Sequence, residues 1–253
     1  MALFNDGSIS ELADLQAQET SILDTANAEG IDLAAKLVLA QREIGVELTA
    51  FLLTNDDGAL GEVAARNLSK VAVTEALRQW HVFRTLALAF RDLYHNQLND
   101  RYGQKWKEYA RLADERSRLL YESGVGVVLA PLPRAGAPVV EAIAGAASGA
   151  TYFLRASWVN SAGAEGAPGA PTAFTTDDGF VPRVTLGPAP AGVTGWHLYA
   201  GFAADGVARQ TDAALPPGES WTPAGEGLRA GPAPGTGQEP DLFIRKTQRT
   251  IRG

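Results

Sequence analysis

The chain has 253 residues, a formal net charge of −7 and no cysteine. The absence of cysteine excludes a disulfide framework, a thiol nucleophile and a cysteine-ligated zinc site. Net acidity argues against general nucleic-acid binding, because phosphate contacts need clustered Lys and Arg.

The N-terminal stretch "MALFNDGSISELADLQAQETS" lacks a charged segment followed by an apolar run, and no stretch of about 18 apolar residues occurs. We therefore expect a soluble protein made in a cytoplasm, with no membrane partner. All 14 prolines fall between Pro131 and Pro240. This uneven placement predicts two different architectures in one chain.

The proline-free part has helical periodicity in four segments. They are predicted to begin at Ser8, which forms a capping box with Glu11, to begin near Asp32, and to cover about 69–97 and 100–122. Apolar residues at spacings of three and four put one face of each segment toward a shared core. The sequence thus predicts an antiparallel α-helical bundle over residues 1–124.

Two features of the helical part could suggest a metal site. Asp56 and Asp57 lie in the polar stretch "TNDDGALGE", where aspartate favours turns through local hydrogen bonds. His81 and His95 are fourteen residues apart and cannot form the i, i+4 pair of a helical metal site. We expect a turn at the two acids and surface or partly buried positions for both histidines.

The second half reads as short strands separated by Gly and Pro turns. In "TYFLRASWV", Tyr152, Leu154, Ala156 and Trp158 share one face. In "GWHLYAGF", the residues predicted to point inward are Trp196, Leu198, Ala200 and Phe202. His197 falls on the outward phase, with no expected partner. The pattern predicts a linker at 125–137 and a small antiparallel β-sandwich at 138–230.

Residues 231–253 have no apolar periodicity and many Gly and Pro residues, which predicts an extended arm. The arm ends in "FIRKTQRTIRG", a basic tail with no acid after Asp241. Three interpretations are open: a protein partner for the tail, a solvated terminus without a partner, or a weak salt-sensitive contact with DNA.

Signatures of catalysis are missing from the sequence. It contains no phosphate-binding glycine loop, nucleophile elbow or His-Glu-x-x-His motif. Ser148 in "GAASGAT" is predicted to lie in a turn between strands. We expect no catalytic residue, no cofactor and no metal, although an unrecognised helical active site is an open alternative.

The helical block containing "WHVFRTLALAFRDLYHNQLNDRYGQKWKEYARLADE" resembles the core of the head-to-tail adaptor, or connector, proteins of tailed bacteriophages. The stretches "YFLRASWVNSAGAEGAPGAP" and "GVTGWHLYAG" are similar to strands of fibronectin type III and immunoglobulin-like modules. The resemblance implies a structural virion protein, synthesised in the host cytoplasm. It implies a homo-oligomeric ring, usually a dodecamer, below the portal, with the β domain decorating the neck.

The same resemblance implies partners for the tail. The portal protein would receive the C-terminal arm, downstream tail or nozzle proteins would follow the ring, and genomic DNA would pass through its lumen. In the arm, Phe243 and Ile244 would pack on the portal. The residues expected to meet portal carboxylates are Arg245, Lys246, Arg249 and Arg252.

A binding module of a different class is the alternative function. A tail-fibre or surface protein could hold carbohydrate, or another protein, on its β-sandwich. Trp158, Trp196 and Trp221 are the residues that could stack on sugar rings. Since Trp158 and Trp196 fall on the inward phase, the pattern favours core packing for these two.

Overall fold

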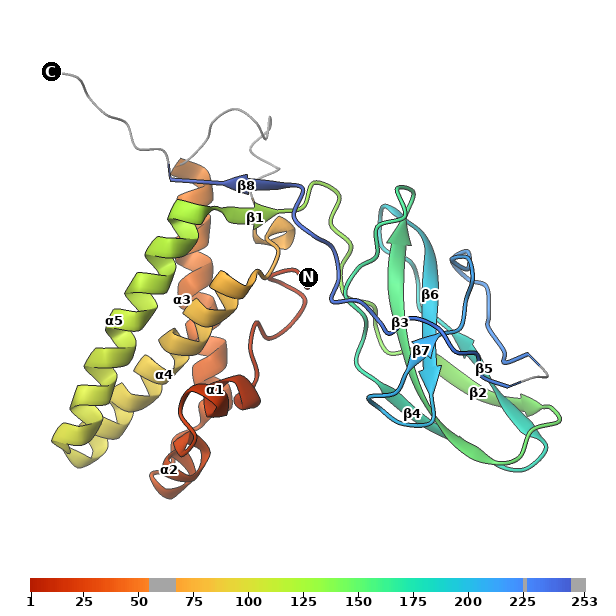
Figure 1. Cartoon of the computed structure of the whole chain (residues 1–253), viewed down its shortest axis with the longest axis horizontal. Coiled ribbons are helices and arrows are strands. Elements are labelled where there is room, and N and C mark those ends of the chain that lie inside the picture. The colour runs from red at the N-terminus through yellow and green to blue at the C-terminus, as the bar shows by residue number, and fades with distance from the viewer. Residues whose placement is uncertain (55–66, 225–226, 247–253) are drawn as a thin grey trace, which may run out of the picture. The chain divides into compact units, whose positions relative to one another are not determined.

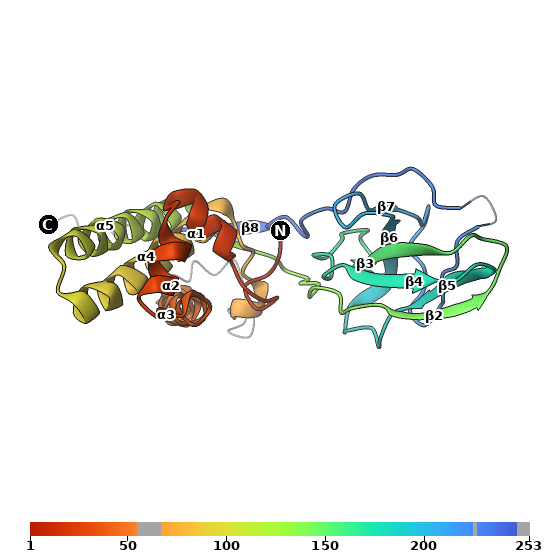
Figure 2. The ribbon, with the colours of Figure 1, turned by 90° about the horizontal axis from the view of Figure 1, so that it is seen from below.

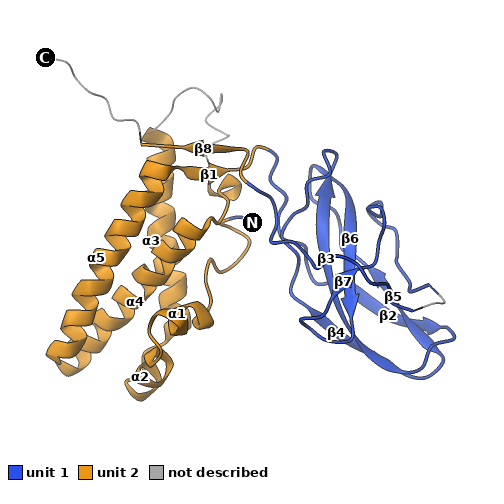
Figure 3. Ribbon diagram, in the orientation of Figure 1, with its two compact units in different colours: residues 1–3, 130–239 blue, residues 4–129, 240–253 orange. Residues whose placement is uncertain are grey.

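The protein is described by a computed structural model that covers residues 1–54, 67–224 and 227–246. The chain folds into two compact units (Figure 3). The helical unit comprises residues 4–129 and 240–253, and the β unit comprises residues 1–3 and 130–239. Helices come first and antiparallel strands follow, which confirms the predicted α-then-β order.

The helical unit contains five α-helices, one 3₁₀-helix and two short strands among its described residues (Figure 1). The elements are α1 (Leu12–Gln18), α2 (Ile22–Ala28), α3 (Leu33–Thr54), η2 (Leu68–Lys70), α4 (Glu75–Gln97), α5 (Asp100–Ser123), β1 (Val125–Val127) and β8 (Leu242–Ile244). None of the helices in the described part of the chain is long and apolar enough to cross a membrane.

Helix α4 forms the centre of the helical unit. It packs against α1, α3 and α5, and about half of its residues are buried, including Trp80, Phe83 and Phe90. Tyr109 of α5 stacks on the last two of these rings, with centroid distances of 6.3 Å and 5.5 Å. Figure 2 shows α4 lying between α3 and α5. The sequence of α4 is accordingly apolar around most of its circumference.

The starts of the first and third predicted helices differ from the structure. Helix α1 begins at Leu12, and Glu11 is the N-cap, because its backbone N–H donates to the Asp14 carboxylate at 2.8 Å. Ser8 lies before the helix, and its hydroxyl donates to the carbonyl of Ser10 instead. The predicted helix at 69–97 begins only at Glu75, because the backbone of residues 70–72 pairs with residues 126–128.

The largest difference from the predicted layout is a strand pair formed by distant residues. Val125–Val127, predicted as linker, form β1, and Leu242–Ile244, predicted as arm, form β8 antiparallel to it. Ile244 is 4% exposed and belongs to the core of the helical unit. A Cβ at Gly126 would lie 2.7 Å from Pro240, so the pairing needs glycine there. The chain thus returns to the helical unit near its C-terminus.

The β unit is built from two antiparallel sheets. Its strands are β2 (Val139–Ala144), β3 (Ala150–Asn160), β4 (Thr172–Thr176), β5 (Phe180–Thr185), β6 (Val193–Gly201) and β7 (Ala208–Arg209). One sheet has the order β4-β3-β6-β7, and the other pairs β2 with β5. Both sheets contribute to one apolar cluster, since Val184 of β5 is buried with Trp158 of β3 and Trp196 of β6.

The alternation predicted for the two long strands is confirmed at most positions. Tyr152, Leu154, Ala156 and Trp158 are buried in one cluster, as are Trp196, Leu198 and Ala200. Phe202 was predicted inward but is 62% exposed, because β6 ends at Gly201. His197, predicted outward and unpartnered, is nearly buried, and its Nδ1 lies 2.7 Å from the Thr211 hydroxyl.

The predicted arm is held at several points before it reaches the helical unit. Arg209 N–H donates to the carbonyl of Pro232, and the Gln238 side chain bonds to the backbone of both Ala130 and Leu132. The terminal amine of Met1 also donates to the carbonyl of Gln238 at 2.7 Å. These contacts place residues 231–239 in the β unit, so the extended segment is bound rather than free.

The burial of Ile244 predicts a stability role for β8. We expect Ile244→Ala to lower the free energy of unfolding of the helical unit by about 2–5 kcal/mol, the usual cost of truncating a buried isoleucine. Phe243→Ala is the matched control, because this neighbour in the same strand is 52% exposed. It should cost about 1 kcal/mol or less. Denaturant unfolding followed by helical circular dichroism measures both, and equal costs would contradict the assignment of Ile244 to the core.

His81 predicts a pH dependence of the same unit. It is fully buried, and its Nε2 donates to the Leu37 carbonyl at 3.0 Å while its Nδ1 accepts from the Ser10 hydroxyl at 2.7 Å. Burial lowers the pKa of His81, and the Leu37 carbonyl and Asp14 oppose this shift only in part. The neutral ring therefore matches its surroundings.

The pKa of His81 is lower in the folded chain than in the unfolded chain. As the pH falls, the unfolded chain therefore takes up this proton at a higher pH than the folded chain does. The free energy of unfolding should fall as the pH drops below about 6.5. His81→Gln should remove this part of the pH dependence, whatever its effect on stability at neutral pH. Unfolding curves between about pH 8 and pH 5 test this, and parallel profiles for the variant and the parent chain would refute it.

Candidate protein-docking surface

Helix α3 presents apolar side chains on two opposite faces. Its inner face, which includes Leu37, Ile44 and Leu48, is buried in the core. Val38, Val46 and Leu53 lie on the other side and are 51%, 71% and 52% exposed. They are spaced by eight and seven residues, close to two helical turns, so they form one stripe. A helix that is apolar on both sides is normally covered on both sides.

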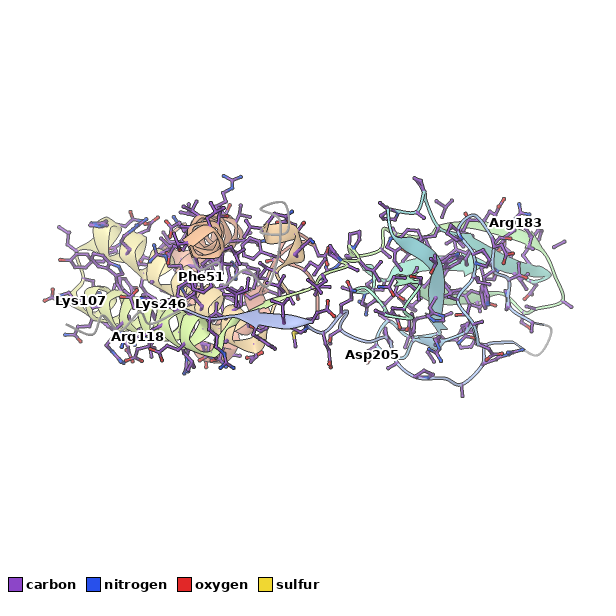
Figure 4. All side chains as sticks on the ribbon, turned by 90° about the horizontal axis from the view of Figure 1, so that it is seen from above. Phe51, Lys107, Arg118, Arg183, Asp205 and Lys246 are labelled. Atoms are coloured by element: carbon purple, nitrogen blue, oxygen red, sulfur yellow. The ribbon has the colours of Figure 1, made fainter. Side chains whose placement is uncertain are left out.

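An apolar outer face is not a general property of the helices, as a comparison with α5 shows. Helix α3 has four charged residues among 22, whereas α5 has eleven among 24. The exposed positions of α5 are mostly charged, as for Lys107 and Arg118, which Figure 4 labels. The charged outer face of α5 is therefore well solvated, whereas the outer face of α3 exposes apolar side chains to water.

The stripe forms the floor of a groove with a volume of about 1080 Å³. We call this the α3 outer groove: its floor runs from Val38 to Leu53, and its walls are Phe4, Asn5, Gly7, Ser8 and Leu68. Among the described residues that line the groove, Arg42 is the only charged one. It is exposed, and it makes no ion pair within the described part of the chain. The groove is therefore an apolar surface with one available cation.

The walls of the groove are fixed by hydrogen bonds and close packing. The Gln41 side-chain amide donates to the carbonyls of Phe4 and Gly7, at 3.0 Å and 2.9 Å. Phe4 N–H donates to the Val71 carbonyl at 2.8 Å. Phe4 and Leu68 both approach Gly45, where a Cβ would be 3.4 Å from each. A pre-formed apolar groove of this kind can accept a partner without first ordering its own walls.

The residues predicted to bind a portal lie in β8 and in the tail that follows it. Ile244 is buried by the chain's own helices, so it is not available to a partner. Phe243 is half exposed, and Arg245 and Lys246 are exposed. Arg249 and Arg252 lie outside the described residues. Of the four predicted residues that the structure describes, Ile244 is buried and the other three are exposed.

Arg245 and Lys246 already have local contacts. Arg245 Nε donates to the Ser123 carbonyl at 3.0 Å, and Lys246 N–H donates to the Tyr121 carbonyl at 2.9 Å. Both carbonyls belong to the last turn of α5, where a positive charge also favours the helix dipole. The start of the basic tail thus caps α5. Neither side chain forms an ion pair with an acid in the described part of the chain, so both charges remain available to a carboxylate partner.

A buried polar cluster in the β unit was not predicted from the sequence. Ser157 and Tyr199 hydroxyls both donate to the Glu165 carboxylate, and His197 lies opposite Ser157 in the strand register. Burial raises the pKa of Tyr199, and Glu165 raises it further. Burial also lowers the pKa of His197. The alternation of the strands predicts that Ser157, His197 and Tyr199 share one face of the sheet. It does not predict that the segment with Glu165 lies over them.

The geometry of this cluster does not form a nucleophile–base pair. Ser157 is fully buried and its hydroxyl donates to Glu165, while the His197 ring is hydrogen-bonded to the Thr211 hydroxyl. The bonds instead tie residue 165 onto the sheet. In the described part of the chain, no three His, Asp or Glu side chains gather to hold a metal ion.

The tryptophans considered for sugar stacking are used in packing. Trp158 and Trp196 are 4% and 0% exposed. Trp221 is partly buried against the same cluster, and its backbone exchanges two 2.8 Å hydrogen bonds with Val184. A sugar-binding platform requires exposed ring faces, so this arrangement favours the α3 outer groove over the β unit as the candidate site.

In comparisons with known proteins, no family model, no curated protein sequence and no solved structure matches this chain. The functional assignment therefore rests on the chain's own residues and geometry.

Proposed function

We propose that the protein is a non-catalytic structural component of a tailed bacteriophage, a head-to-tail adaptor that forms a ring below the portal. In this proposal the helical unit is the ring-forming bundle, and the β unit is an immunoglobulin-like sandwich that decorates the neck. The ring consists of identical chains, with a dodecamer expected, and continues into the tail or nozzle proteins. Genomic DNA passes through its lumen.

The observation that carries the proposal is the second apolar face of α3. A ring requires each chain to bury surface against its neighbours, and obligate contacts of this kind are more apolar than ordinary surface. The exposed Val38, Val46 and Leu53, in a groove with fixed walls, supply such a surface. We assign this groove to a neighbouring copy in the ring.

The tail supplies the proposed contact with the portal. The exposed side chains of Phe243, Arg245 and Lys246 begin the contact, and Arg249 and Arg252 extend it. Arginine pairs with carboxylate through two parallel hydrogen bonds, and a ring multiplies each modest contact. Ile244 has no part in this contact, because the helical core already buries it.

The position of β8 determines how the tail is tested. Truncation after Asp241 would delete β8 and damage the helical unit, whereas truncation after Lys246 leaves the whole strand in place. The purified chain is mixed with portal rings from the same genome, and the complexes are followed by native mass and negative-stain imaging. We expect the full chain to add a ring to the portal.

Two altered tails should bind at least about tenfold more weakly, which corresponds to 1.4 kcal/mol. They are the truncation after Lys246 and the pair Arg249→Glu with Arg252→Glu. Thr247→Ala with Thr250→Ala is the matched control, since it alters the same segment but keeps its charge, and it should bind normally. A full chain that ignores the portal overturns the adaptor proposal. If both altered tails bind the portal normally, the tail is not the portal-binding segment.

A further inference from the structure

Strand β8 has one edge with which no residue in the described part of the chain pairs. Among the described residues, β8 forms a two-stranded sheet with β1 alone, and Val71 forms a bridge to β1 on the other side of that strand. Figure 1 shows β8 beside β1 at the end of the helical unit. The backbone N–H and C=O groups on a free strand edge are a ready template for another extended segment.

The hydrogen bonds of β1 determine which of its residues bond to β8. The Gly126 carbonyl accepts from one of residues 70–72 at 3.0 Å, and Val128 N–H donates to another of them at 2.8 Å. Bonding groups alternate between the two sides of an extended strand. The groups of Val125 and Val127 therefore point in the opposite direction, toward β8.

The same alternation determines which groups of β8 lie on its free edge. Leu242 and Ile244 are the register partners of the two valines, so their backbone groups bond to β1. Lys246 N–H also bonds inward, to the end of α5. The backbone N–H and C=O of the alternate residues, Phe243 and Arg245, therefore face away from β1. We call these four groups the β8 open edge.

The side chains at the open edge define the kind of segment that fits it. A Cβ at Gly124 would lie 2.8 Å from the Cβ of Phe243 and 3.2 Å from the Cγ of Arg245, so both side chains leave the strand on one side. Phe243 is 52% exposed, and Arg245 is exposed without an ion pair in the described part of the chain. Opposite residues in paired strands have their Cβ atoms about 5 Å apart. An apolar residue would therefore suit the position opposite Phe243, and a carboxylate the position opposite Arg245.

The charge of this segment favours an acidic partner over a second copy of the chain. Four cations and no acid follow Asp241 in the sequence. The Asp241 carboxylate already accepts from Leu129 N–H at 2.7 Å. Two open edges paired with each other would bring together twice these four cations, with only the two engaged aspartates to offset them. Like charges that face each other across strands are destabilising.

We propose that an extended acidic segment of a partner protein adds to the β8 open edge as an antiparallel strand. Its backbone bonds to Phe243 and Arg245, and one of its carboxylates lies opposite Arg245. Main-chain hydrogen bonds supply affinity in this mode of recognition, and side chains supply specificity. The inference rests on the proposed function for the identity of the partner, the portal, and it names the structural form of the portal segment that the tail binds.

Proline substitutions test the direction of the backbone groups. Phe243→Pro removes an N–H that faces outward, and proline is tolerated on an edge strand in that situation. Its melting temperature should match that of Phe243→Ala. Ile244→Pro removes an N–H that bonds to β1, so it should be clearly less stable than Ile244→Ala. If Phe243→Pro is destabilised relative to its alanine variant as strongly as Ile244→Pro is, the open edge is assigned to the wrong residues and the proposal fails.

A defined peptide tests the chemistry of the partner without the portal. The probe is a short threonine peptide that carries one glutamate and, two residues later, one valine. At millimolar concentration it should shift the amide signals of Phe243 and Arg245 in nuclear magnetic resonance spectra of the isotope-labelled full chain, and the shifts should saturate. The same peptide with lysine in place of glutamate should bind at least about tenfold more weakly. Absence of a saturable shift at these two amides, or equal binding of both peptides, overturns the proposal.

The proline variant distinguishes strand addition from attraction by charge alone. Phe243→Pro keeps every charge but loses one outward N–H, so it should bind the glutamate peptide at least about tenfold more weakly than Phe243→Ala does. Equal binding by the two variants excludes strand addition. If the chain forms a dimer that Phe243→Pro abolishes and Phe243→Ala keeps, the occupant is a second copy and the acidic-segment proposal is wrong.

Portal rings then separate this inference from the proposed function. Phe243→Pro should bind the portal at least about tenfold more weakly than Phe243→Ala. A chain that takes the glutamate peptide on β8 but ignores the portal keeps the strand-addition site and loses the adaptor role. A chain whose Phe243→Pro variant binds the portal normally keeps the adaptor role, and its portal contact then does not use the β8 open edge.

Discussion

The pairing of β8 with β1 closes the helical unit around the inserted β unit. It places Ile244 in the helical core, although residues 130–239 of the β unit lie between the two strands in sequence. Asp241 strengthens the junction, since its carboxylate accepts from Leu129 N–H at 2.7 Å and its N–H donates to the Val127 carbonyl at 2.9 Å. The core of the helical unit is therefore complete only when β8 is paired with β1. The β unit behaves as an insertion between two parts of one core.

This closure divides the basic tail into two roles. Up to Lys246 the backbone is committed to β1 and to the end of α5, with Ile244 buried and the side chains of Phe243, Arg245 and Lys246 exposed. Arg245 and Lys246 can serve both roles, because a cation near the end of a helix is stabilised by the helix dipole and, when it is exposed, can still attract a negatively charged partner.

The helices of the long core could be predicted from the sequence because their signal is local. Apolar residues at spacings of three and four identify α3, α4 and α5, and Asn99, which accepts from Arg101 N–H at 3.0 Å, is a recognisable cap. The start of α1 was misplaced because two serines and two acids near residue 10 offer competing caps, and His81 of a distant helix binds Ser10. Strands β1 and β8 have three residues each, and nothing local indicates a partner more than a hundred residues away.

The candidate site was only partly predictable for the same reason. The low number of charges on α3 and the spacing of Val38, Val46 and Leu53 are visible in the sequence, but a second apolar stripe does not show by itself which of the two is buried. The groove itself depends on Gln41 holding residues 4 and 7, a tertiary contact without a sequence signature. Leu98 could not be recognised either, because a leucine after a helix gains meaning only once its backbone is known to be left-handed. Glycine would suit the backbone at position 98, so neither the helical pattern nor local packing predicts the exposed leucine found there.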